Sequence, residues 1–391
     1  MGPYDTSFTE GLGVMSSSQI THHEPGVYLG LREDSYLADP ALGYSSLGAL
    51  RQPLEFWFNS PINTVFPKPP KDQKYFERGT ACHVLFLEPP GTYDRTYGIV
   101  PTRMTNPNAI DTIPELIAAC KKHGLATNYA VKADLVDRLS RGAPKVEILE
   151  VERQKFFASG KRPISADDHM RIQLSFRMAM RTREELGAGE DDLTLADAFT
   201  GGLSEVSCFW EDEAGIRQRA RFDKLKPNVT IDLKTISDWK PSDFKTSLLK
   251  EIRIRNYLGQ VVHYNEARRQ LRKFVAADRV FGGTKAQRTL LKRIAKQETW
   301  AWTFVFCKMT GFPAVRAIVF TPENMGLVEE GPDFMQQFVR AADERRDALT
   351  QYQFFKELYG DEPGSIWFDN EIVYQPTETD WGVSSVWNGE N

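Results

Sequence analysis

Two short segments combine carboxylates and a lysine at spacings that suit metal chemistry. The stretch Thr230–Thr235 reads TIDLKT, so Asp232 and Lys234 are two residues apart. On a β-strand this spacing places both side chains on one face. An earlier segment ends at Asp223, and the turn-forming stretch Lys226–Asn228 predicts that Asp223 lies near Asp232. Two carboxylates on neighbouring strands favour Mg²⁺ or Mn²⁺, and a lysine beside them can orient or help deprotonate water and balance developing negative charge.

An Asp-x-Lys pair also has an ordinary interpretation. On an exposed strand it usually forms a solvated ion pair without a chemical role. Here Ile231 and Leu233 alternate with the two charged residues, so the strand has one apolar face and one charged face. Charged residues recur on the preceding segment, and this repetition favours a site.

Two further features are candidates for the same site. Gln260 and Tyr264 are four residues apart in a helical segment and share a face. They could hold a phosphate or the attacking water; a buried tyrosine bonded to a glutamine is the alternative. His83 is a single histidine in an otherwise apolar helical stretch, where a structural role is more common than a ligand role.

The surrounding segments predict the elements that position these residues. Residues 204–211, 216–225 and 229–235 are rich in β-branched and aromatic types and are separated by turns, which predicts an antiparallel meander. A helix is expected from about 242 to 274, then strands at 300–309 and 313–320 and a helix at 332–359. Upstream, helices are expected at about 44–58, 78–87 and through most of 111–187, where Ser165 is a good N-cap. This order predicts an α/β or α+β core with a helical N-terminal elaboration.

The bulk composition is that of a globular protein. The 391 residues are 41% hydrophobic and carry a formal net charge of -4, which excludes no enzyme with a local basic groove. No apolar run reaches the ~18 residues that a membrane span needs, and the N-terminus lacks a signal-peptide pattern, so we expect a cytoplasmic protein without membrane association. The four cysteines form no CxxC pair, which argues against a zinc or iron–sulfur site.

In chain order the candidates read Gly79-x-x-x-His83, Glu205, Arg221-x-Asp223, Asp232-x-Lys234 and Gln260-x-x-x-Tyr264. This set resembles the PD-(D/E)XK nuclease superfamily in its RecB-like branch. The nuclease domain of phage and prophage exonuclease VIII (RecE-like) is the most similar member that we identify. The resemblance runs from about residue 44 to 350, and its further segments are 44–50, 78–89, 161–168 and 304–306.

The resemblance implies a restriction-endonuclease-like core, in which a mixed central sheet is flanked by helices. It also implies roles: His83, Asp223, Asp232 and the Leu233 carbonyl would bind metal, Lys234 would handle the water, Gln260 and Tyr264 would position substrate, and Glu205 would serve a second metal. Arg219 and Arg221 are expected on the same strand face as Asp223, where they could contact phosphate.

One region departs from the family pattern. Residues 268–296 contain ten Lys/Arg and one acid, Asp278. The segment is either a DNA-contacting arm, with Arg268, Arg269, Arg272 and Lys273 among its contacts, or a solvated helical face. The clustered C-terminal cysteines of iron–sulfur relatives are absent from the sequence, so no such cluster is expected.

We therefore expect a Mg²⁺-dependent exonuclease that degrades linear double-stranded DNA from its ends, with Mn²⁺ as a substitute. Further expectations follow from the resemblance alone: the 5′-to-3′ direction, 3′ single-stranded tails, a homo-oligomeric ring, a RecT-like annealing partner and a phage or prophage origin in a bacterial host. The alternatives are an endonuclease or single-strand-specific nuclease of the same fold, a catalytically inactive DNA-binding scaffold, and a chance coincidence of the motifs.

The expected domain organisation is a single nuclease domain between an N-terminal segment and a C-terminal tail. It comprises a disordered N-terminus at 1–25, one domain at 26–360 and a tail at 361–391. Within the domain we expect the catalytic core at about 200–320, the helical elaboration at about 44–200 and a basic insertion at about 268–296.

Overall fold

A seven-stranded mixed sheet forms the centre of the molecule in the computed structural model, which describes residues 20–66, 73–128, 131–186, 193–237, 243–328 and 333–368. Its strand order is β7-β1-β4-β5-β6-β8-β9. β6 and β8 pair in parallel, as do β1 and β7, and the other neighbours pair antiparallel. The strands are β1 Gly26–Leu29, β4 Leu203–Glu211, β5 Arg217–Leu225, β6 Val229–Ile236, β7 Val280–Gly282, β8 Ala301–Lys308 and β9 Val315–Phe320.

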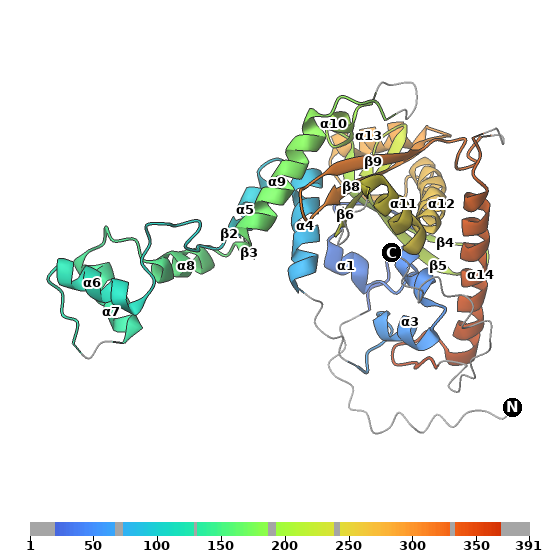
Figure 1. Cartoon of the computed structure of the whole chain (residues 1–391). Helices are drawn as coiled ribbons and strands as arrows, with labels where there is room; N and C mark the ends of the chain where they lie inside the picture. The colour runs from blue at the N-terminus through green and yellow to red at the C-terminus, as the bar shows by residue number, and fades with distance from the viewer. Residues whose placement is uncertain are drawn as a thin grey trace, which may run out of the picture.

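Helices cover both faces of this sheet (Figure 1). Alternate residues of β8 separate the two cores: Val305 packs toward α4 and α9, whereas Phe304 and Phe306 pack toward α11, α12 and α14. The helices are α1 Glu33–Ala38, α2 Tyr44–Ala49, α3 Pro53–Asn59, α4 Gln73–Leu87, α5 Thr92–Thr96, α6 Ile113–Lys122, α7 Lys132–Gly142, α8 Leu149–Ala158, α9 Ala166–Arg181, α10 Leu195–Ala198, α11 Phe244–Ile254, α12 Tyr257–Ala276, α13 Lys285–Ala295 and α14 Gln336–Tyr359. The predicted mixed sheet flanked by helices is confirmed.

The predicted meander and the Ser165 N-cap are confirmed, but two predicted helices are each divided in two. The helix expected at 44–58 stops before Pro53, which begins α3 because its missing N–H costs nothing in a first turn. The helix expected at 242–274 is interrupted at Asn256, whose left-handed φ of 49° ends α11 and caps α12.

The predicted disordered N-terminus and the predicted C-terminal tail fall largely outside the described residues, which begin at residue 20 and end at 368. The part of the N-terminus that is described is ordered: the His23 backbone N–H donates to Asp39 Oδ2 at 2.7 Å. β1 follows directly and pairs with β4. The prediction of disorder through residue 25 is therefore wrong for residues 20–25, because Asp39 is buried and draws this segment onto the body.

The basic segment 268–296 is part of the fold. It contains the end of α12, the edge strand β7 and helix α13. Leu291 and Ile294 of α13 are buried against β4, and β7 extends the sheet beside β1. The apolar residues of the segment complete the second core, and its assignment as an insertion relative to the family stays a prediction.

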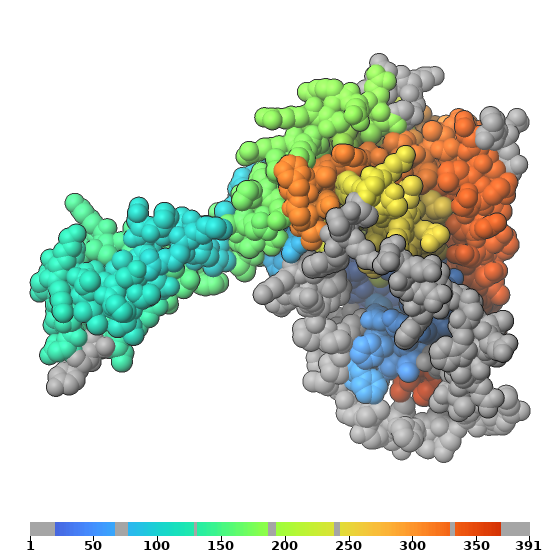
Figure 2. Space-filling model, viewed as in Figure 1, coloured from blue at the N-terminus to red at the C-terminus, as the bar shows by residue number. Residues whose placement is uncertain are grey.

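Residues 97–164 leave the body as a helical arm (Figures 1 and 2). Its two ends are joined by a short parallel pair, β2 Tyr97–Ile99 and β3 Arg162–Ile164. Helices α6, α7 and α8 lie between these strands and have a core of their own, which includes Leu116, Leu135 and Leu139. The chain therefore leaves the body and returns to it at the same place, where β2 and β3 pair.

A buried histidine links α12 to β5 and α14. His263 is fully buried; its Nε2 donates to the Arg219 carbonyl at 2.9 Å, and its Nδ1 accepts from Arg345 Nε at 3.4 Å. Burial and the nearby Arg345 charge lower the pKa of His263 to about 3. The neutral ring makes both contacts, so the folded protein keeps His263 unprotonated. In the unfolded chain the same histidine binds a proton below its ordinary pKa of 6.5.

This histidine predicts an acid-sensitive fold. Because the unfolded state binds the extra proton, stability contributed by His263 is fully present above pH 6.5 and falls as the pH drops toward 3, by about 1.4 kcal/mol per pH unit. Urea unfolding at pH 7, 6 and 5 measures this slope, with His263→Gln as the comparison. The variant is expected to be less stable at pH 7 but to lose less on acidification; parallel curves for both proteins would contradict the assignment.

Candidate active site

The site lies where β5 and β6 separate. The two strands pair only at Lys224–Ile231 and Leu225–Thr230. One residue further, Asp223 and Asp232 stand on either side of the opening. Asp223 Oδ2 accepts a hydrogen bond from the Leu233 backbone N–H at 2.8 Å, so its carboxylate partly replaces the missing ladder bond. The separation makes room for side-chain oxygens between two strands that would otherwise pair.

Glu205 faces this opening from the neighbouring strand. It lies between the pairs Ser204–Lys224 and Val206–Phe222, and therefore opposite Asp223. Its φ of 55° is left-handed, a conformation that costs a non-glycine residue on the order of 1 kcal/mol and that concentrates at functional sites. Its carboxylate forms an ion pair with Arg221 Nε.

His83 of α4 completes a group of possible metal ligands. One ligand atom each from His83, Glu205 and Asp223 lies within 4.8 Å of the others. His83 Nε2 also lies 3.1 Å from the Leu233 carbonyl oxygen, and His83 Nδ1 lies 3.9 Å from Asp223 Oδ2. The structure thus brings three of the predicted residues and the predicted carbonyl together.

The electrostatics of Asp223 fit a cation at this place. Burial, and next to it the charge of Asp232, raise the pKa of Asp223 to about 7. A divalent ion would relieve this repulsion, and the two carboxylates supply oxygen ligands of the kind that Mg²⁺ and Mn²⁺ take. The residues present therefore fit a divalent cation.

Asp232 belongs to a second group beside the first. Its side chain is 5% exposed and lies between Lys234 Nζ, at 2.6 Å from Oδ2, and Gln260 Nε2, which donates to Oδ1 at 2.6 Å. Burial by itself lowers the pKa of Lys234, but the charges of Asp232 and Asp223 outweigh it and raise that pKa above its ordinary value. Lys234 is thus held as a cation, also 5.0 Å from the centre of the Tyr257 ring, which suits charge balance better than proton abstraction.

Tyr264 lies one turn after Gln260 on α12, as predicted. Its ring packs edge-on against Phe222 and Trp302, with centroid separations of 5.4 and 5.6 Å. Burial raises the pKa of Tyr264 well above its ordinary value, so the phenol stays neutral. This packing fixes α12 over β5 and β8 and so holds Gln260 against Asp232.

The structure corrects two of the predicted DNA contacts. Arg219 is 7% exposed and donates to the carbonyls of Tyr36 and Asp39, and Arg268 is 1% exposed and donates to Thr230 Oγ1 at 2.7 Å. Burial lowers the pKa of Arg268 to about 9. Both guanidiniums are buried and donate to acceptors of the interior, which for Arg268 also include the Lys226 carbonyl, and neither is open to DNA.

The other predicted contacts lie nearer the surface. Arg221 is bound to Glu205 and to the Leu31 carbonyl, which makes it part of the site rather than a free phosphate contact. Arg269 pairs with Glu266, Arg272 donates to the Ala295 carbonyl, and Lys273 is exposed. These three remain predictions as DNA contacts.

Two cations on the same sheet face were missed by the sequence reasoning. Lys234 pairs in register with Phe306, and Phe306 pairs with Arg316. Arg316 and Lys308 both lie over the Phe244 ring, at 5.9 and 5.6 Å from its centre. Basic groups therefore continue from Lys234 toward the edge strand β9. The two-residue alternation that ends in Phe306-x-Lys308 is the signal that could have revealed them.

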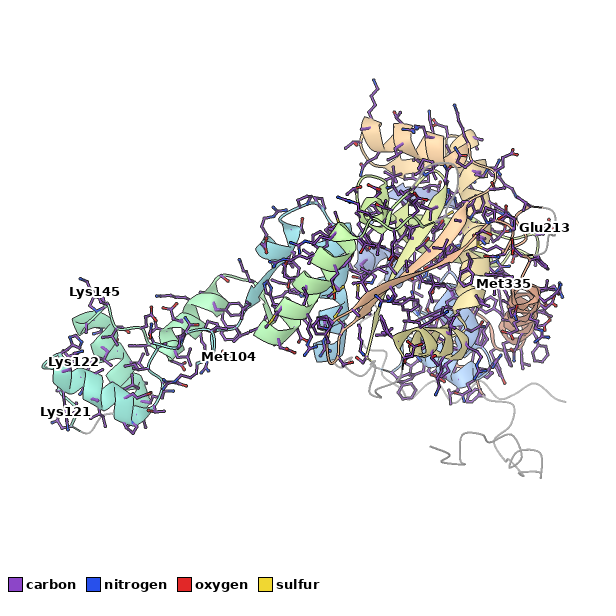
Figure 3. The ribbon with its side chains drawn as sticks, turned by 45° about the horizontal axis from the view of Figure 1, so that its top comes forward. Met104, Lys121, Lys122, Lys145, Glu213 and Met335 are labelled. Carbon is purple, nitrogen blue, oxygen red and sulfur yellow. The ribbon has the colours of Figure 1, made fainter. Side chains whose placement is uncertain are left out.

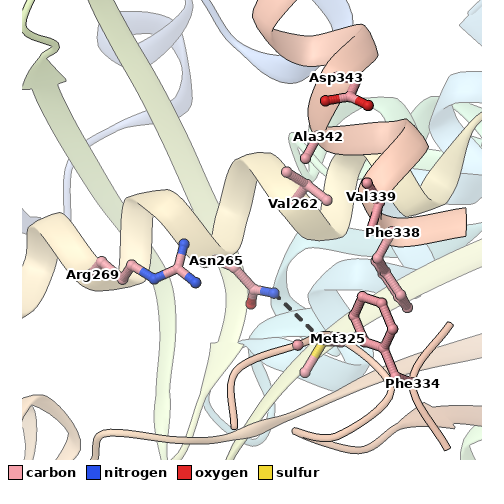
Figure 4. Close-up of a pocket in the computed structure, with 10 residues that line it drawn as sticks. Val262, Asn265, Arg269, Met325, Phe334, Phe338, Val339, Ala342 and Asp343 are labelled. Carbon is pink, nitrogen blue, oxygen red and sulfur yellow. Dashed lines mark hydrogen bonds between the residues drawn. The ribbon is translucent and has the colours of Figure 1, made fainter. Parts of the chain in front are cut away.

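A pocket of about 300 Å³ lies away from this group, between α12, α14 and the loop after β9 (Figure 4). Its lining is mainly apolar, with Arg269 and Asp343 as its charged residues. Asn265 is already used there, since it donates to Met325 Sδ and accepts from Trp300 Nε1. The pocket lacks the acidic cluster and is not the candidate site.

Comparison with known families identifies the family of the chain. The model of a PDDEXK-like domain of unknown function (DUF3799) matches residues 67–282, more than half of the 391-residue chain. The chain belongs to this family. The match includes His83, Glu205, Asp223, Asp232 and Lys234, and it confirms the predicted superfamily. This PDDEXK-like protein has no match among curated proteins.

Among solved structures, the PDDEXK-like chain is similar to a crystal structure of a protein from Eubacterium rectale described as "Putative exonuclease". The two share 12% sequence identity with a TM-score of 0.30, over 82% of this chain and 100% of the other. Within the described residues, no helix is long and apolar enough to cross a membrane.

Proposed function

We propose that this PDDEXK-like protein is a divalent-metal-dependent deoxyribonuclease. The observation that carries the proposal is the meeting of His83, Glu205 and Asp223 beside the Asp232–Lys234 ion pair. Phosphodiester hydrolysis needs stabilisation of developing negative charge and a positioned water, and these two groups supply residue types suited to both. The intact set argues against an inactive scaffold, since a decayed site usually loses one member.

The residues would divide the work as follows. His83, Glu205 and Asp223 would hold the cation, which when bound acts as a Lewis acid toward the scissile phosphate. Asp232 anchors Lys234, whose ammonium would stabilise the charge that develops on the phosphate. Gln260 holds Asp232 in place by donating a hydrogen bond to its carboxylate.

The finer proposal is an exonuclease that acts on ends of linear duplex DNA, 5′ to 3′, and leaves 3′ single strands for a RecT-like annealing partner. Mg²⁺ as the metal, a ring-shaped oligomer and a phage or prophage origin complete it. This proposal rests on the motif order and on family resemblance. An endonuclease or single-strand-specific nuclease of the same fold is the competing function.

Digestion of duplexes labelled separately at each 5′ and 3′ end, with and without Mg²⁺, tests the proposal. Early release of the 5′ label from linear DNA, with closed circular duplex left intact, is the expected result. Cutting of closed circles would assign an endonuclease instead. Absence of cleavage with either Mg²⁺ or Mn²⁺ would overturn the nuclease assignment.

Metal binding should be visible as stabilisation of the fold. A ligand at 100 times its Kd stabilises the native state by about 2.7 kcal/mol, so Mn²⁺ should raise the thermal midpoint of the wild-type protein. Asp223→Asn removes one carboxylate and is expected to lose most of this shift, while Asp278→Asn in the α12–β7 connection should keep it. An equal shift in all three proteins would place the ion elsewhere.

A further inference from the structure

The outer end of the arm gathers the carboxyl-terminal ends of two helices. Lys132 Nζ, at the start of α7, pairs with Asp111 Oδ1 before α6 at 2.8 Å. At the other end, Arg138 of α7 donates to the Ala126 carbonyl after α6 at 2.7 Å. The two helices therefore run in the same direction, and the residues that follow each of them lie at the same end of the arm.

This outer end is basic. Residues 117–128 and 135–146 contain five Lys/Arg and one acid, Asp137. Figure 3 shows the three lysines that it labels on the arm along its outer side, away from the body, and all three are exposed. Within the described residues these lysines form no ion pair, whereas Arg141 pairs with Asp137 at 2.9 Å. The five basic residues are Lys121, Lys122, Arg138, Arg141 and Lys145.

Helix-dipole compensation does not account for this charge. Each helix C-terminus carries a partial charge of roughly -0.5, so two termini and Asp137 leave a surplus of about three positive charges. Lys145 also lies beyond the last residue of α7. At the inner end, by contrast, Arg103 pairs with Glu115 and Lys132 pairs with Asp111. The outer end of the arm thus carries exposed lysines without acidic partners among the described side chains, whereas Arg103 and Lys132 at the inner end are both paired.

The arm begins beside the candidate active site. Arg162 of β3 pairs with Glu77 of α4 at 2.9 Å, and the next residue, Arg78, reaches the Met309 carbonyl just after β8. Gly79 of α4 lies close to β6, since a Cβ atom placed on it would be 3.5 Å from Oγ1 of Thr235. Thr235 is the residue that follows Lys234. The root of the arm therefore borders the strand ends that carry the catalytic group.

We propose that the outer end of the arm binds the phosphate backbone of DNA at a distance from the cleavage site. The proposal rests on the proposed function for the identity of the nucleic acid, which is the duplex held by the site. Exposed lysines without acidic partners suit sequence-independent phosphate contacts, because each neutralised phosphate releases counterions. The arm then adds affinity and holds long duplexes while the site cuts.

The test compares the full-length protein with the variant Lys121→Glu/Lys122→Glu/Lys145→Glu. Arg340→Glu/Arg346→Glu/Lys356→Glu on α14, on the opposite side of the body in Figure 1, makes the same charge change as a control. Binding to a long duplex is measured by fluorescence anisotropy without divalent cations from 50 to 200 mM NaCl. Circular dichroism and thermal midpoints confirm that all three proteins fold.

The arm variant should bind at least about tenfold more weakly at the lowest salt. Its slope of log affinity against log salt should be smaller by about 2 to 3, as expected for three lost phosphate contacts at ~0.9 each. The control should match the wild type, and duplexes too short to reach the arm should bind all three proteins alike. Unchanged affinity and slope in the arm variant would overturn the proposal, as would a change confined to its oligomeric state, which would assign this surface to a second copy of the chain.

The same experiment separates this inference from the proposed function. Wild-type protein that binds duplex through the arm but does not cleave it with Mg²⁺ or Mn²⁺ would refute the nuclease assignment and leave the arm contact standing. Cleavage of short duplex by the arm variant at the wild-type rate, with equal binding of long duplex, would refute only the arm contact.

Discussion

Asp232→Ala is expected to reduce Mg²⁺-dependent cleavage by at least about a thousandfold, which corresponds to roughly 4 kcal/mol of transition-state stabilisation. The reason is geometric: Asp232 is the buried partner of both Lys234 Nζ and Gln260 Nε2. Without it the lysine loses the carboxylate that fixes its position, and Asp223 loses the neighbouring charge that favours a cation. DNA binding should be largely retained, because Asp232 is only 3% exposed.

The measurement pairs single-turnover cleavage of end-labelled duplex with anisotropy binding in the absence of divalent cations. Glu213→Ala removes an exposed acid from the turn between β4 and β5 and should behave as the wild type (Figure 3). Asp232→Asn is a second variant that keeps the volume of the side chain. A loss of cleavage by this variant would not be explained by misfolding. A folded, purified Asp232→Ala protein that still cleaves with Mg²⁺ would contradict the site.

Lys234→Met is expected to lower cleavage by about 10²- to 10³-fold while metal binding persists. Methionine retains most of the apolar stem that packs near Tyr257 but removes the charge that lies 2.6 Å from Asp232. The ligand group of His83, Glu205 and Asp223 does not include this lysine. The variant should therefore keep the Mn²⁺-dependent thermal shift of the wild type and lose cleavage activity. A variant that no longer binds the metal would instead lose the thermal shift.

Lys234→Arg distinguishes charge from geometry. A planar guanidinium is larger than an ammonium and does not fit the space between Asp232 and Tyr257 in the same way, so charge alone should restore little activity. Exposed Lys250→Met, on α11, is the matched control and should cleave within a few-fold of the wild type. If Lys234→Met lost the Mn²⁺ shift and the rate together, Lys234 would instead be part of the metal environment.

Local sequence pattern was sufficient for the elements around the site. The alternation of Ile231 and Leu233 with Asp232 and Lys234 predicted a strand with one charged face, and β6 has it. The four-residue spacing of Gln260 and Tyr264 predicted one helical face, and α12 provides it. Such predictions succeed because strand and helix periodicity depend on residues a few positions apart.

Only the tertiary structure decided which charged side chains meet. Arg219 and Arg221 are two residues apart on one strand, yet Arg219 is buried against backbone carbonyls while Arg221 binds Glu205. The sequence motif likewise says nothing of Glu205's left-handed backbone, which appears where β4 passes Asp223. The Arg219 contacts join segments about 180 residues apart in the chain, and the Arg221–Glu205 pair joins two neighbouring strands. Burial and pairing of this kind are properties of the packed sheet and not of local spacing.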